Sequence, residues 1–152
     1  MRREVAGVFL TVAVTAGCAT PYQEGGFTGG VSASPLSESI YEIRAQGNAF
    51  ISAGKIQDYA LLKSAEICRQ NNFTHFVPLS EKDTTQKGTI QNNTYNTNCF
   101  GYSCTTTGGG STPYSKPGTT MRIKLLRETD GIPDTAFSCS VIYNSLSSKY
   151  ID

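Results

Sequence analysis

Five cysteines in a chain of 152 residues limit what this sequence can fold into more than any other feature. They are Cys18, Cys68, Cys99, Cys104 and Cys139. An odd number leaves one cysteine over when the others form disulfides. The role of the odd cysteine therefore decides the compartment of the protein, the length of the mature chain and the constraints on its fold.

The N-terminal segment indicates which cysteine stands apart. Arg2 and Arg3 precede an apolar stretch over residues 5–16, and small residues then lead to Cys18. This pattern is typical of a secretory signal peptide with its cleavage site. The stretch is too short to span a bilayer, which takes about 20 apolar residues. A short buried element of a cytosolic fold is the alternative, but we expect residues 1–17 to be a signal peptide.

Residues 14–18 resemble the lipobox of bacterial lipoproteins. The resemblance implies that Cys18 becomes the first mature residue and carries acyl groups, several of which hold a protein firmly in a bilayer. Thr15 departs from the Leu that lipoboxes usually have. Ala19 stands where an inner-membrane retention signal would have Asp. The resemblance therefore implies a lipid anchor in the outer membrane, facing the periplasm.

The charge balance excludes one class of partner. Removing residues 1–17 takes away Arg2, Arg3 and Glu4, which reduces the 13 basic and 12 acidic residues of the whole chain to 11 of each. The remaining basic residues form no cluster, whereas nucleic-acid binding needs concentrated Lys and Arg to neutralise phosphates. We therefore expect no nucleic-acid partner, and a remaining chain about the size of one domain.

The four other cysteines allow three disulfide connectivities, which sequence alone does not choose between. Cys99 and Cys104 enclose the short segment "CFGYSC", so we favour Cys99–Cys104 and, by elimination, Cys68–Cys139. The alternative is a metal site. The cysteine spacing does not match a zinc ribbon, and His75 is the only histidine. We expect disulfides in the oxidising periplasm, with no metal and no cofactor.

Composition divides the mature chain into a tether and a domain. Residues 18–37 are rich in Gly, Ser, Pro and Thr, which predicts a flexible tether. Residues 38–152 are expected to form a single domain. Within it, residues 84–120 form a polar, Thr- and Asn-rich insertion with a triple Gly. The insertion is either a tolerated surface loop or a β-hairpin held by Cys99–Cys104.

Residues 53–72 give the clearest secondary-structure signal, an amphipathic helix. Apolar and small residues fall on one arc of the helical wheel: Ile56, Ala60, Leu61, Ser64, Ile67 and Cys68. The opposite arc carries mainly polar residues: Lys55, Asp58, Leu62, Glu66 and Arg69.

Three strands and a second helix complete the predicted domain. Alternation predicts one strand around Tyr41 and Ile43, one from Phe73 with Phe76 or Val77 inward, and one over residues 119–128. Asp134 is expected to cap a last helix, although residues 139–143 also suit a strand. The core-facing residues of this last helix would be Phe137, Val141, Ile142 and Leu146. The predicted fold is α+β, with a small antiparallel or mixed sheet of about three strands and two helices on one face.

Few residues suggest catalysis. His75 lies in an apolar strand without an evident nucleophile, and Glu66 is isolated among scattered carboxylates. No nucleophile elbow, zinc-protease pair or phosphate-binding loop is present in the sequence. We expect a non-catalytic protein; the alternative is a cell-wall hydrolase that uses Glu66 or His75.

Several of these segments together resemble a proteobacterial family of small uncharacterised envelope lipoproteins. Tyr41, Gly47-Asn48, the helical residues 59–66 and His75-Phe76 carry the resemblance. Members have no assigned enzymatic activity, so the resemblance implies a location and a fold but no catalytic residue. We expect a binding, scaffold or envelope-sensing module. Its partner would be another envelope protein or peptidoglycan, with residues 84–120 as the contact surface. The long insertion and the four disulfide-type cysteines depart from the family pattern.

Overall fold

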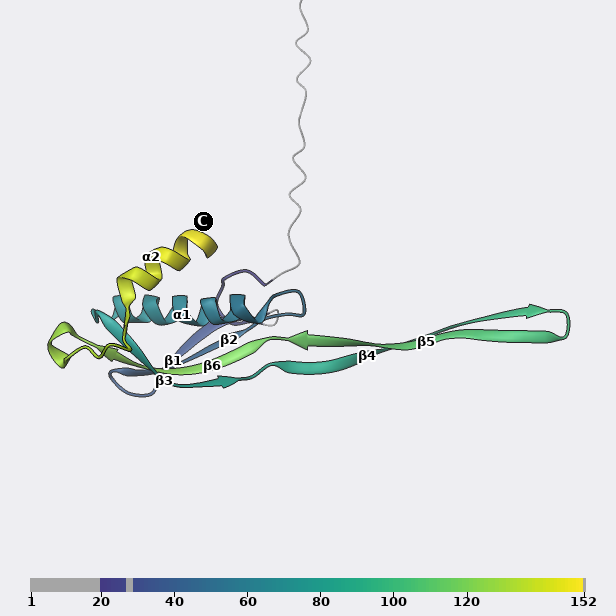
Figure 1. The fold of residues 1–152 in the computed structure, drawn as a ribbon, viewed down its shortest axis with the longest axis horizontal. Helices are drawn as coiled ribbons and strands as arrows, with labels where there is room; N and C mark the ends of the chain where they lie inside the picture. Colours follow the sequence, from purple (N-terminus) through teal and green to yellow (C-terminus); the bar gives the residue numbers. More distant parts are fainter. Residues whose placement is uncertain (1–19, 27–28, 152) are drawn as a thin grey trace, which may run out of the picture.

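The computed structural model describes residues 20–26 and 29–151, so the expected signal peptide and Cys18 lie outside the described residues. The chain is α+β, with two α-helices and antiparallel sheets, as expected (Figure 1). The expected number of about three strands is wrong, because the described residues form seven. In chain order the elements are β1 (Gly30–Pro35), β2 (Ile40–Gln46), α1 (Ala53–Gln70), β3 (His75–Asp83), β4 (Gln86–Phe100), β5 (Ser103–Lys116), β6 (Gly118–Leu126), the 3₁₀ turn η1 (Glu128–Asp130), β7 (Phe137–Ser138) and α2 (Cys139–Tyr150).

Five strands form the sheet of the domain, in the order β1-β2-β6-β3-β7. β6 lies at its centre and pairs antiparallel with β2 on one side and β3 on the other. Alternating residues of these strands face α1, so Ile43, Phe76 and Ile123 are fully buried. The alternation expected for β2 and β6 is therefore confirmed.

The helices lie in two successive layers on one side of this sheet. α1 covers the sheet, and α2 lies over α1 (Figure 1). The Ser52 side chain caps α1 by accepting a hydrogen bond of 3.3 Å from the main-chain N–H of Lys55. The disulfide between Cys68 and Cys139 joins the last turn of α1 to the first residue of α2.

This layering corrects details of the helix predictions. Leu62, which the helical wheel placed on the outer face of α1, is fully buried, because α1 is covered by the sheet on one side and by α2 on the other. α2 begins at Cys139 after Ser138, not at a cap formed by Asp134. Val141, expected in the core, is exposed, since only one face of α2 rests on α1.

The predicted tether is wrong for the described residues of 18–37. Val31 and Ala33 face the core as part of β1, which pairs with β2 at the edge of the sheet. Gly30 has a φ of 133°, and a Cβ there would collide with the main-chain oxygens of Gln23 and Glu24. Sequence reasoning missed this strand because its Ser and Gly content is also typical of linkers.

The insertion at residues 84–120 forms a long hairpin of β4 and β5 (Figure 1). It continues the β3–β6 pair and projects away from the helices. At the junction the N–H of Thr84 donates to the carbonyl of Gly118 over 2.9 Å, and the Asp83 side chain accepts from the N–H of Thr85. Of the two expected alternatives for this insertion, the structure has the hairpin.

Candidate functional site

The tip of the β4–β5 hairpin is a two-residue turn closed by a disulfide. Gly101 and Tyr102 form the turn. Cys99 and Cys104 are the second pair of facing residues from the turn, and a disulfide joins them. Gly101 has a φ of 62°, which the first central position of a type II′ hairpin turn requires. The disulfide limits how far the two strands can separate at this end.

Two aromatic side chains at this tip are almost entirely in solvent. Phe100 has a relative exposure of 95% and Tyr102 of 112%. They are the most exposed large hydrophobic residues in the described part of the chain. Aromatic residues contribute much of the binding energy at protein interfaces because they bury a large area and lose little conformational entropy. The tip is therefore a candidate contact surface.

The shaft of the hairpin carries no charge. Residues 88–115 contain no Asp, Glu, Lys, Arg or His. Thr hydroxyls link the two strands, with Thr97 Oγ1 lying 2.9 Å from Thr106 Oγ1. Edge strands in soluble proteins commonly carry charged side chains that prevent association with other strands. A long strand pair without them is therefore unusual.

A bulge divides the hairpin into an inner and an outer part. The register shifts between Asn92 and Tyr95, so β4 has an extra residue relative to β5. Opposite the bulge, Gly108 and Gly109 have φ values of 130° and 71°. A Cβ on Gly108 would collide with the main-chain oxygen of Thr94. Bulges of this kind bend and twist a strand pair.

The sheet face opposite α1 forms a second polar surface. A hollow of about 550 Å³ there is lined by charged residues that include Glu42, Lys82 and Arg122. Arg44 and Arg122 donate to the Glu42 carboxylate over 2.6 Å and 3.2 Å. These hydrogen bonds hold the pKa of Glu42 below its ordinary value. Both guanidinium groups thus have a partner, and the hollow is a solvated sheet face.

Glu66 belongs to a charged cluster on α1. Lys63 is largely buried and forms ion pairs with Glu24 at 2.5 Å and Glu66 at 3.4 Å. Burial alone would lower the pKa of Lys63, but the hydrogen bond to Glu24 and the charge of Glu66 raise it above its ordinary value. The Tyr22 hydroxyl is buried close to Glu66, and burial together with the Glu66 charge raises its pKa. The cluster fixes residues 20–26 against α1.

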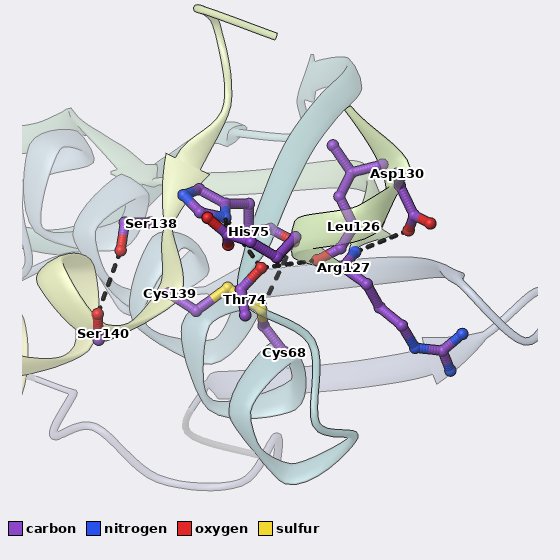
Figure 2. A network of polar contacts seen from close by, with 10 residues as sticks. Cys68, Thr74, His75, Leu126, Arg127, Asp130, Ser138, Cys139 and Ser140 are labelled. Atoms are coloured by element: carbon purple, nitrogen blue, oxygen red, sulfur yellow. Dashed lines mark hydrogen bonds and ion pairs between the residues drawn. A yellow bond between two sulfur atoms is a disulfide. The ribbon is translucent and has the colours of Figure 1, made fainter. Parts of the chain in front are cut away.

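His75 lies in a separate network at the start of β3 (Figure 2). Its Nδ1 is 3.0 Å from Thr74 Oγ1 and 3.7 Å from a carboxylate oxygen of Glu128. The Thr74 hydroxyl donates to the carbonyl of Leu126 over 3.4 Å, so it can accept from His75. His75 is absent from the residues that line the hollow beside Glu66. The two residues of the hydrolase alternative therefore share neither a hollow nor a partner.

The cysteines of the described chain form the two disulfides Cys68–Cys139 and Cys99–Cys104, which supports the expectation of disulfide bonds. No group of three or more metal-ligating side chains occurs within residues 20–26 and 29–151. The lipidation expected at Cys18 stays a prediction. No helix in the described part of the chain is long and apolar enough to cross a membrane.

Comparison with known proteins adds no assignment, because no family model, curated protein or solved structure matches this chain. The sequence analysis proposed residues 84–120 as a contact surface, which stays a prediction, and did not single out Phe100 or Tyr102. Their position on either side of Gly101 between two close cysteines was the signal that could have identified them.

Proposed function

We propose that this protein is a non-catalytic binding module, held at the periplasmic face of the outer membrane by acyl groups on Cys18, and that the β4–β5 hairpin is its binding arm. The observation that carries this proposal is the disulfide-closed tip with Phe100 and Tyr102 in solvent. The signal-like N-terminal sequence supports the location.

The hairpin suits contact at a distance from the domain. β4 contains 15 residues, and a strand rises by about 3.4 Å per residue, so the tip lies roughly 50 Å from the base of the arm. The disulfide restricts the tip before binding, which reduces the entropy that a partner must overcome. Uncharged Thr and Asn side chains along the shaft keep it hydrated without attracting charged molecules non-specifically.

We favour an envelope protein as the partner. Two exposed aromatic residues on either side of Gly101 at a disulfide-closed tip suit a pocket on another protein, where such residues account for most of the binding energy. Peptidoglycan is the alternative partner, since sugar rings also stack on aromatic side chains. The hydrolase alternative has less support, because Glu66 is paired with Lys63 and His75 contacts Thr74.

The location is tested by the intact mass of the protein extracted from membranes, with and without reduction and alkylation. We expect loss of residues 1–17, added acyl mass on Cys18 and four cysteines that react only after reduction. An uncleaved chain with five free thiols would overturn both the anchor and the compartment.

The binding arm is tested by photo-crosslinking in cells. Benzoylphenylalanine replaces Phe100 at the tip or, as the matched control, Val141, which is exposed on α2. We expect specific crosslinks to an envelope protein from position 100 and none from position 141. Crosslinks to glycan strands would identify peptidoglycan as the partner instead. Equal crosslinking from both positions would contradict a role for the tip.

A further inference from the structure

The hairpin has strand edges without partners. β4 and β5 form a sheet of only two strands, so each strand has one paired edge and one free edge within the described structure. Two-stranded sheets without a packed face are marginally stable in water. A free edge also offers a row of N–H and C=O groups to which another strand can bind. A further strand bound to a free edge would therefore stabilise this hairpin.

The register shows which main-chain groups point outward. The Cα atoms of Cys99 and Cys104 are 4.0 Å apart, which is the shorter spacing of a pair without mutual main-chain hydrogen bonds. Because the two kinds of pair alternate, Thr97 and Thr106 form another pair of this kind. The N–H and C=O groups of Thr97 thus face the free edge of β4, and those of Thr106 face the free edge of β5.

The two edges are not equally suited to a new strand. Pro113 lies in β5 opposite Thr89, and its ring has no N–H to offer at the outer edge. Gly108 and Gly109, whose positive φ values depart from regular strand geometry, also lie in β5. β4 contains the extra residue of the bulge between Asn92 and Tyr95 but no Pro between Gln86 and Phe100, so every residue of β4 has a main-chain N–H. The edge of β4 is therefore better suited to a further strand than that of β5.

The composition of this edge suits an identical partner. Two copies of a charged strand would repel each other, but residues 88–115 carry no charge. Antiparallel pairing about a two-fold axis places each residue of one copy against the matching part of the other, so the contact is self-complementary. Thr, Ile and Tyr in β4 are residues that favour strands.

We propose that two copies of this protein associate through the β4 edges of their hairpins. The two strands pair antiparallel about a two-fold axis and form a four-stranded sheet of order β5-β4-β4-β5. Because this contact uses the β4 edge of both copies, it closes at the dimer. The two tips then point in opposite directions, with Phe100 and Tyr102 of each copy free. This pairing does not require the lipid anchor or the partner proposed above.

The test uses two full-length copies with different affinity tags, co-expressed and extracted in detergent. We expect purification through one tag to recover the other copy. Thr97→Pro removes the outward N–H of β4, and recovery should fall by about tenfold or more. Thr106→Pro is the matched control, since it loses the same Thr–Thr contact but blocks only the β5 edge. Recovery should stay at the wild-type level in this variant.

Non-reducing mass spectrometry of each variant checks that the Cys99–Cys104 disulfide has formed and that the hairpin tip is therefore closed. Three results would overturn the proposal. The wild-type protein could recover only one tag, which would show a monomer. The Thr97→Pro protein could keep its second copy, or the Thr106→Pro protein could lose it equally, and either result would show that the β4 edge does not form the contact.

Discussion

The two sheets of this protein share antiparallel pairing but differ in what supports them. In the five-stranded sheet, Ile43, Phe76 and Ile123 lie under α1 and are fully buried. In the hairpin, by contrast, no residue of β4 or β5 is buried. The domain therefore derives its stability from apolar burial. The hairpin depends on main-chain hydrogen bonds and the tip disulfide. This difference supports the proposal that the domain is the scaffold and the hairpin the binding arm.

The largest effect should come from the core of the domain. Phe76→Ala should lower the free energy of unfolding by about 3–5 kcal/mol, because it leaves a cavity beneath α1. Ile90→Ala, which truncates an exposed side chain of β4, should change it by less than about 0.5 kcal/mol. Urea denaturation followed by the circular dichroism of the helices measures both. Equal losses would show that the hairpin side chains are buried in solution.

The second largest effect concerns the two disulfides, which should stabilise different regions of the molecule. Replacing Cys68 and Cys139 by Ala removes a link between residues 71 apart in sequence, which should cost about 4 kcal/mol of global stability. Replacing Cys99 and Cys104 by Ala should speed amide exchange in the hairpin while the exchange of α1 stays unchanged. Hydrogen exchange with mass spectrometry distinguishes the two effects. Faster exchange of α1 in the second variant would show that the regions unfold together.

The bulge allows a smaller, local test. Gly108→Ala forces a positive φ on Ala and a collision with Thr94, which should destabilise the hairpin locally by about 1–3 kcal/mol. Gly110→Ala is the control, because a Cβ there meets no atom within 4 Å. The rate of amide hydrogen exchange in residues 86–116 should rise in Gly108→Ala and stay unchanged in Gly110→Ala. No difference between the variants would mean that the bulge is not needed to order the arm.

The smallest effect concerns acid stability. Burial alone would raise the pKa of Asp58 on α1, but hydrogen bonds from Tyr150 at 2.6 Å and Lys149 at 3.0 Å on α2 lower it. The resulting stabilisation, about 1 kcal/mol or less, is fully present above the unfolded pKa of about 3.9 and is lost as the pH falls through the lower folded value. Asp58→Asn should remove this acid-dependent loss.

Thermal unfolding between pH 2 and 6 measures this contribution, with the exposed Asp134→Asn as control. The hairpin has no carboxylate in residues 88–115, so its amide exchange should show no matching change beyond the intrinsic pH dependence. An unchanged acid profile in Asp58→Asn would show that this contact does not hold α2 on α1.

Local patterns in the sequence were sufficient for the regular parts of the domain. The periodicity around Ile56 predicted α1, and alternation predicted the inward faces of β2 and β6. The short "CFGYSC" segment favoured the tip disulfide. β1 was missed because its core-facing residues, Val31 and Ala33, are few and lie among Ser and Gly. The number of strands was also wrong because β4 and β5 were only one of two alternatives for the insertion, and because Phe137 and Ser138 of β7 form too short a strand to show a period.

The sequence by itself predicted α1, the inward faces of β2 and β6 and the disulfide at the hairpin tip, because these features depend on residues that are close together in the chain. Only the tertiary structure decided that α2 lies over α1, which buries Leu62 and leaves Val141 in solvent. It also decided that β6 lies between β2 and β3, so that residues 84–120 leave the sheet as one extended arm. These outcomes depend on contacts between residues distant in sequence, which no local period records.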